Sequence, residues 1–193
     1  RVVFFMMTQT ETAATSAIGV AGAVGIAVQF VGSWNPSAKA KAAGAPVKFD
    51  FSKLEPGQMN VVEWRGMPVY VLYRTEAQLA ALPGLNSLLK DPDSKNLYQQ
   101  PPNITGVDRS IRPNLLVVVG LCTHLGCAPQ FIPEVGVASL GGDKWVGGFF
   151  CPCHGSKFDL SGRVYDGVPA SANLLVPPYS FEDDKVLVIG VNP

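Results

Sequence analysis

Two short loops contain every cysteine and histidine of this 193-residue chain, and no other feature restricts its fold so strongly. Residues 122–127 read Cys-Thr-His-Leu-Gly-Cys, and residues 151–156 read Cys-Pro-Cys-His-Gly-Ser. Each loop therefore offers one cysteine and one histidine at metal-ligand spacing, together with one further cysteine. A fold that uses both pairs of ligands must bring these two segments face to face.

Three uses of these residues can be compared. A structural zinc site usually has two closely spaced cysteines followed by two histidines, whereas here the two residue types alternate between loops. Two disulfides would leave both histidines without a role. A 2Fe–2S cluster with two cysteines on one iron and two histidines on the other matches better, with ligands Cys122, His124, Cys151 and His154. That assignment leaves Cys127 and Cys153 free to form a disulfide between the loops.

The loops resemble those of the Rieske iron–sulfur proteins of bacterial cytochrome bc complexes. The resemblance extends to residues 109–113 (Arg-Ser-Ile-Arg-Pro), to the apolar run 116–121, to Phe149-Phe150 and to residues 167–170 (Gly-Val-Pro-Ala). It covers nearly the whole chain. It implies a mainly β fold: an antiparallel β head of the Rieske type with an inserted cluster-binding subdomain, plus one amino-terminal transmembrane helix.

The same resemblance implies a function. The chain would be the iron–sulfur subunit of a quinol–cytochrome c reductase, or complex III, and would turn over only within that oxidoreductase. Its partners would be a cytochrome b subunit, a c-type cytochrome subunit and quinol, in a dimeric complex. His154 would be the catalytic ligand that faces the quinol and later the haem. The alternatives are a cytochrome bf-type Rieske subunit and a Rieske ferredoxin or oxygenase component.

Charge counting explains why histidine ligands suit such an acceptor. Two ferric ions and two sulfides carry a net charge of +2, which two thiolates neutralise, whereas four thiolates would give −2. A neutral centre accepts an electron more readily, and such centres have potentials of roughly −150 to +300 mV, against about −400 mV for plant-type ferredoxins. Each imidazole also has a second ring nitrogen that can carry a proton.

Residues beside the ligands are expected to tune the cofactor. By the resemblance, the Ser156 hydroxyl bonds a bridging sulfide and Leu125 forms an apolar lid. Phe158 departs from the family, in which many members have tyrosine with its hydroxyl on a ligand sulfur. Ser171 replaces a proline common in the neighbouring loop.

An uncharged segment precedes the head. Hydrophobic residues make up 47% of the chain and charged ones 16%, and 15 basic residues balance 15 acidic ones, so nothing indicates nucleic-acid binding. From Thr12 to Ala38 no side chain is charged, which is long enough for one helix to span the lipid bilayer. A cleaved secretory signal is the alternative, but the run exceeds the usual signal core of about 7–15 residues.

These features predict three parts: a transmembrane anchor in residues 1–34, a flexible hinge in 35–46 and a periplasmic Rieske head in 47–193. The cluster-binding subdomain would span about residues 121–172. An interloop disulfide requires an oxidising compartment, so we expect a single-pass protein of the bacterial inner membrane with its head on the periplasmic side.

Short apolar or alternating runs predict strands in the head. Thr75 and Gln78 form a capping-box pattern that predicts a helix over 76–82, ended by Pro83-Gly84. Residues 90–113 are polar and contain prolines, which predicts a surface insertion. The predicted strands span residues 61–64, 69–73, 115–120, 145–150 and 186–189.

Overall fold

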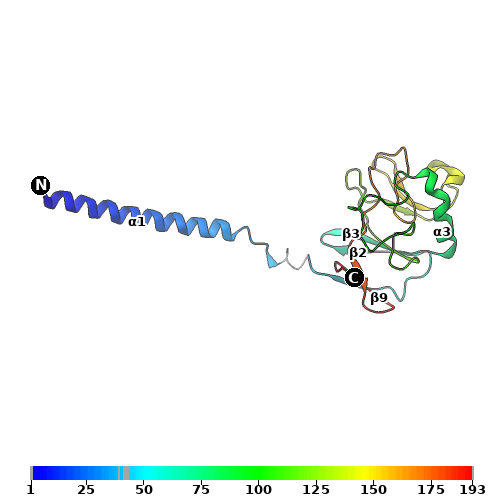
Figure 1. Ribbon diagram of the computed structural model, residues 1–193, viewed down its shortest axis with the longest axis horizontal. Helices are drawn as coiled ribbons and strands as arrows, with labels where there is room; N and C mark the ends of the chain where they lie inside the picture. The colour runs from blue at the N-terminus through cyan, green and yellow to red at the C-terminus, as the bar shows by residue number, and fades with distance from the viewer. Residues whose placement is uncertain (1, 39, 41–43, 193) are drawn as a thin grey trace. The chain divides into compact units, whose positions relative to one another are not determined.

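The computed structural model describes residues 2–38, 40 and 44–192, and the side chains among them from residue 11 onward. The chain divides into two compact units between residues 42 and 43 (Figure 1). The predicted hinge over 35–46 lies partly outside the described residues, which do not include 39 and 41–43.

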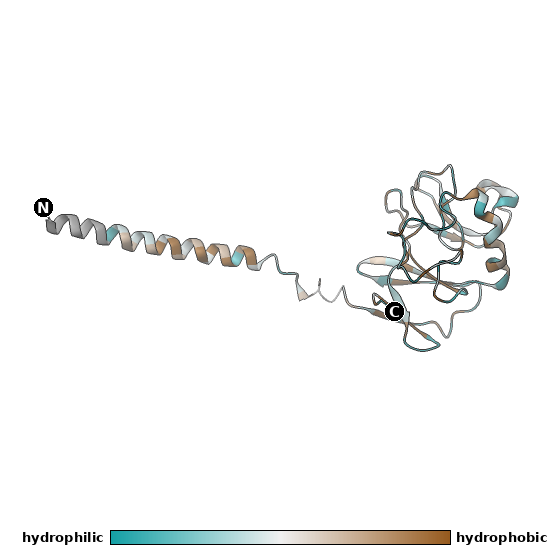
Figure 2. Ribbon diagram, viewed as in Figure 1, coloured by the Kyte–Doolittle hydropathy of each residue, from teal (hydrophilic) through white to brown (hydrophobic). Residues whose placement is uncertain are grey.

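The amino-terminal unit is a 31-residue helix, α1 (Val2–Gly32). Its part from Glu11 to Gly32 has 22 residues and a mean hydropathy of 1.7. At 1.5 Å per residue this part is about 33 Å long, close to the thickness of a bilayer core. Figure 2 shows the apolar residues along its carboxyl-terminal half. The predicted apolar helix is thus present, although it begins before the uncharged run and includes Glu11.

The second unit is built from antiparallel β-strands. In the described residues the strands form three sheets of three, in the orders β1-β9-β8, β2-β3-β4 and β5-β6-β7. The first two sheets join segments far apart in the chain, whereas the third contains both strands that flank the second cysteine loop. Their bounds are β1 Val47–Asp50, β2 Met59–Trp64, β3 Met67–Tyr73, β4 Leu115–Val119, β5 Gln130–Ile132, β6 Gly148–Cys151, β7 Ser156–Phe158, β8 Tyr179–Phe181 and β9 Val186–Ile189.

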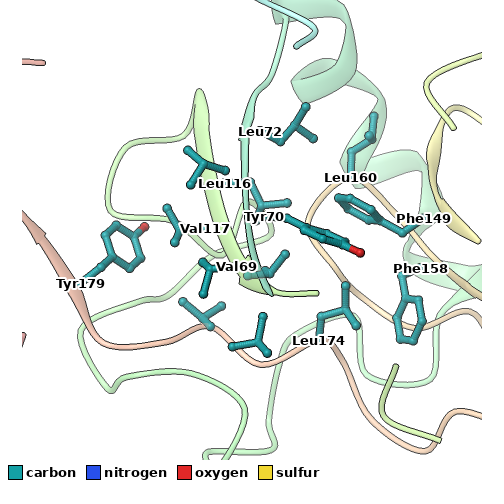
Figure 3. Packing of buried hydrophobic residues seen from close by; sticks show 14 of the residues in the cluster. Val69, Tyr70, Leu72, Leu116, Val117, Phe149, Phe158, Leu160, Leu174 and Tyr179 are labelled. Atoms are coloured by element: carbon teal, nitrogen blue, oxygen red, sulfur yellow. The ribbon is translucent and has the colours of Figure 1, made fainter. Parts of the chain in front are cut away.

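The main hydrophobic core lies around β3 and β4. All five residues of β4, Leu-Leu-Val-Val-Val, are buried, which explains why this strand is a continuous apolar run instead of an alternating one. Figure 3 shows its Leu116 and Val117 among side chains that include Tyr70 and Phe149. Cys122 and Cys151 belong to the same buried cluster, so the core extends to both cysteine loops.

Helix α3 (Glu76–Ala81) confirms the capping-box prediction. The Thr75 hydroxyl accepts a hydrogen bond from the Gln78 amide, and the Gln78 side chain accepts one from the Thr75 amide. The predicted stop at Pro83-Gly84 is wrong in one respect. The α-helix ends there, but a 3-10 helix, η1 (Leu82–Leu88), continues through both residues with its proline in the first turn, where no amide hydrogen bond is required.

The segment 145–150 is only partly a strand. Strand β6 begins at Gly148, because the short 3-10 helices η2 (Ala138–Leu140) and η3 (Gly142–Lys144) precede it. Trp145 instead packs in a second, smaller core, where its ring stacks on Tyr165 with centroids 6.0 Å apart. An apolar run alone does not distinguish a strand residue from a buried turn residue.

The segment 90–113 is more than a surface insertion, because Arg109 within it is only 1% exposed. Its guanidinium donates to the carbonyls of Ser161, Gln99 and Leu174 at 3.0, 3.1 and 2.9 Å. Burial lowers the pKa of Arg109 to about 10, so the group stays charged at neutral pH. This buried cation therefore ties the segment to the turn that follows β7.

That turn is closed by a buried ion pair. Asp159 and Arg163 are both fully buried, and their carboxylate and guanidinium lie 2.8 Å apart. The other carboxylate oxygen accepts hydrogen bonds from the Ser161 and Arg163 amides. Because the pair is buried, removing one partner would leave the other charge without compensation.

Gly148 allows β6 and β7 to pack closely. A Cβ atom at this position would lie 2.1 Å from the Phe158 carbonyl oxygen. We predict that Gly148→Ala lowers the free energy of unfolding by roughly 1–3 kcal/mol, because the backbone must shift to relieve the contact. Thermal unfolding of the full chain measures the loss. Gly84→Ala is the matched control, since its Cβ would meet nothing within 4 Å. Equal melting temperatures for both variants would contradict the prediction.

Candidate metal centre

The two cysteine loops contain the same type of backbone turn. The Gly126 amide donates to the Cys122 carbonyl at 2.9 Å, and the Gly155 amide donates to the Cys151 carbonyl at 2.9 Å. Both glycines have left-handed backbones, with φ of 81° and 78°, which other residues rarely adopt. Each loop thus starts at a cysteine and closes on a glycine four residues later, with its histidine inside the turn.

The loops bring two free thiols together. Cys122 is 3% exposed and Cys151 is 2% exposed, and after burial the nearby Cys122 thiol is a further cause of the raised pKa of Cys151. Burial raises the pKa of the Cys151 thiol, whereas hydrogen bonds from the Cys153 and His154 amides act in the opposite direction. These two amides would stabilise a thiolate at Cys151, the form that binds metal.

The histidines also meet. The ring centroids of His124 and His154 lie 4.7 Å apart with the rings nearly perpendicular, at 87°. His124 Nδ1 is buried and has no hydrogen-bond partner among the described residues. Such a buried nitrogen is costly unless something binds its lone pair, so His124 fits a metal-ligand role. His154, in contrast, is exposed.

The predicted disulfide is confirmed. Cys127 and Cys153 are joined with an S–S distance of 2.12 Å, and the bond links one loop to the other. The sulfurs of Cys127, Cys151 and Cys153 lie within 4.8 Å of one another. This trio is nevertheless a poor metal site, because two of its sulfurs are already used in the disulfide. The pair of free thiols, Cys122 and Cys151, is the better donor set.

Ser156 is buried, whereas Leu125 is exposed. Ser156 is fully buried, and its Oγ accepts a hydrogen bond from the Ala170 amide at 3.0 Å. The hydroxyl proton therefore remains to be donated. Leu125 is 72% exposed, so its side chain faces outward from the first loop. Phe158 is fully buried and offers no hydroxyl.

Tyr70 packs against the residues that lead into both loops, a role that its place in an apolar strand does not indicate. Its ring stacks on Phe149 with centroids 5.8 Å apart, two residues before Cys151. A Cβ on Gly120, two residues before Cys122, would lie 2.3 Å from the Tyr70 ring. The hydroxyl donates to the Pro129 carbonyl at 2.8 Å. Burial, and to a smaller extent the nearby Cys151, raises the pKa of Tyr70.

This fold and site define a class of protein. Residues 89–180 match the Rieske 2Fe–2S domain family, a range that contains both loops, the disulfide and Ser156.

Relatives of nearly full length narrow the identification. The ubiquinol–cytochrome c reductase iron–sulfur subunit of Allochromatium vinosum is 50% identical over 185 residues, covering 96% of this chain and 88% of that protein. The subunit of the same name from Bradyrhizobium diazoefficiens is 42% identical over 178 residues and covers 90% of each chain. The chain belongs to the family of Rieske iron–sulfur subunits of ubiquinol–cytochrome c reductase.

A solved structure shows the same fold. A chain of a hyperthermophilic respiratory complex III superposes with a TM-score of 0.50 at 23% identity, covering 91% of this chain and 98% of the other. The predicted fold class, family and 2Fe–2S cofactor are thereby confirmed.

The disulfide should contribute strongly to the stability of the site. Joining residues 26 positions apart removes loop entropy from the unfolded chain worth about 3–4 kcal/mol. We predict that the double variant Cys127→Ser/Cys153→Ser unfolds at a markedly lower temperature and loses its visible cluster absorption in the same transition. An unchanged melting temperature in the full-length protein would show that the loops hold together without the bond.

Proposed function

We propose that Cys122 and Cys151 bind one iron of the cluster and that His124 and His154 bind the other. The observation that carries this assignment is the meeting of two free buried thiols and two imidazoles from two similar turns. The fully buried Ser156 hydroxyl is available to donate to cluster sulfur. When bound, the cluster supplies a one-electron acceptor of comparatively high potential.

His154 is the group that contacts the quinol in this proposal. It is exposed, whereas both cysteine ligands are buried and His124 is only partly exposed. Its ring can accept a hydrogen bond from a quinol hydroxyl and would take up that proton as the quinol gives one electron to the cluster. Leu125, which follows His124 in the first loop and is 72% exposed, supplies an apolar surface for the quinone ring. The same exposed face would later meet the haem of a c-type cytochrome.

The chain acts as one subunit of an oxidoreductase. Relatives named as ubiquinol–cytochrome c reductase iron–sulfur subunits support partnership with a cytochrome b subunit and a c-type cytochrome subunit in a dimeric complex. The electron passes from quinol through this subunit to the c-type cytochrome. The proton is released on the periplasmic side of the membrane, which contributes to the proton-motive force. The chain alone is not expected to turn over substrate.

The head lies on the periplasmic side of the bacterial inner membrane in this proposal. Helix α1 is long and apolar enough to anchor the chain, and the disulfide requires an oxidising compartment. Residues 1–34 would be the anchor, 35–46 a hinge that lets the head move between quinol and cytochrome, and 47–193 the head.

Isotope labelling tests the ligand assignment directly. Because the chain has two histidines, 15N-histidine labels only His124 and His154. We expect pulsed electron paramagnetic resonance of the reduced full-length protein to show two coupled 15N nuclei. Histidine replaced singly, as His124→Cys or His154→Cys, should leave one coupling. A spectrum without nitrogen coupling, or zinc in place of iron by metal analysis, would overturn the assignment.

The pH dependence of the midpoint potential tests the proton-accepting role of the imidazoles. Because uptake of an electron is coupled to uptake of a proton, the potential should fall as the pH rises through the range in which the ring N–H ionises. Redox titration of membranes at several pH values measures the slope. A flat profile from neutral to alkaline pH would rule out coupled transfer at these rings.

A further inference from the structure

A third segment, outside both loops, contacts each of them. We call residues 168–172 the backing segment. Its Ala170 amide donates to Oγ of Ser156, the last residue of the second loop, at 3.0 Å. Its Ala172 carbonyl accepts a hydrogen bond from the Thr123 hydroxyl, which lies between the two first-loop ligands. The position of the backing segment therefore affects both halves of the site.

Lys90 holds this segment from the other side. Its ammonium donates to the carbonyls of Val168 and Ala170, each at 2.8 Å. These two carbonyls flank the amide that contacts Ser156. Two charge-assisted hydrogen bonds to carbonyls two residues apart restrict the segment more than solvation would. In the described part of the chain Lys90 forms no ion pair, and the partners of its ammonium group are these backbone carbonyls.

The backbone of Lys90 is itself anchored. Its amide donates to the Val164 carbonyl at 3.1 Å, and the preceding Leu89 forms an antiparallel bridge with Tyr165. Residues 164 and 165 follow the turn closed by the buried Asp159–Arg163 pair. The ammonium therefore extends from a fixed base.

We infer that Lys90 is a positioning residue for the cluster, acting through the backing segment on the Ser156 hydroxyl. The inference rests on the proposed role of Ser156. When the Ala170 amide is fixed, it occupies one lone pair of Ser156 Oγ and orients the hydroxyl proton toward its acceptor. A donor aimed at cluster sulfur favours the reduced, more negative form and raises the midpoint potential. Without Lys90, the segment and the hydroxyl would move more freely.

The test compares midpoint potentials in the assembled complex by redox titration with electron paramagnetic resonance. Lys90→Met should lower the potential. Lys90→Arg, whose forked donors can still reach both carbonyls, should keep the potential close to that of the unsubstituted protein. Lys53→Met is the matched control, because it removes the same charge from an exposed lysine and should leave the potential unchanged.

A double-mutant cycle tests the route. Ser156→Ala should lower the potential by more than Lys90→Met does, and adding Lys90→Met to Ser156→Ala should have no further effect. Hydrogen exchange should also show faster exchange of the Ala170 amide in Lys90→Met than in Lys53→Met.

The outcomes separate this inference from the proposal beneath it. If Ser156→Ala leaves the potential unchanged, the proposed role of Ser156 fails. If Ser156→Ala lowers the potential but Lys90→Met does not, the Lys90 inference alone is overturned. An equal decrease on adding Lys90→Met in both serine and alanine backgrounds also overturns it, because the lysine charge would then act through space and not through Ser156.

Discussion

The repeated turn that joins a cysteine carbonyl to a glycine amide four residues later is the constraint on which this site depends. It folds each loop so that its cysteine and its histidine lie within the same turn. The left-handed backbone at Gly126 and Gly155 makes this turn possible. Because both loops adopt it, the two thiols and the two imidazoles that we propose as ligands come together, and the disulfide joins one turn to the other.

Burial changes sharply across the site, and this gradient matches its chemistry. The thiols of Cys122 and Cys151 lie within the hydrophobic core, where water would not compete for a bound metal. The exposed His154 stands at the surface, where a substrate can approach. The proposed function needs both properties, because a subunit that accepts an electron from one molecule and passes it to another requires a protected cofactor and a group beside it that reaches the surface.

Much of the support for the site comes from residues with no recognisable motif. Tyr70 joins the strands that lead into both loops, and Lys90 holds the segment behind Ser156. Their roles depend on contacts across long sequence separations, which neither periodicity nor spacing can indicate. The same reason explains why residues 90–113 seemed to be a surface insertion, since their polar character conceals the buried Arg109. Trp145, at the start of an apolar run, belongs to a turn because η3 ends beside it.

By itself the sequence determined the family and the capped start of helix α3, and it predicted the donor set. Cysteine and histidine spacing restricts the possible cofactors, an uncharged run of sufficient length indicates a helix for a membrane, and the Thr75 capping box depends on residues three apart. Only the tertiary structure decided which thiols are free and buried side by side, which imidazole is exposed and which side chains contact the loops from distant segments. These properties arise from packing between distant segments, and burial is a property of the folded chain as a whole.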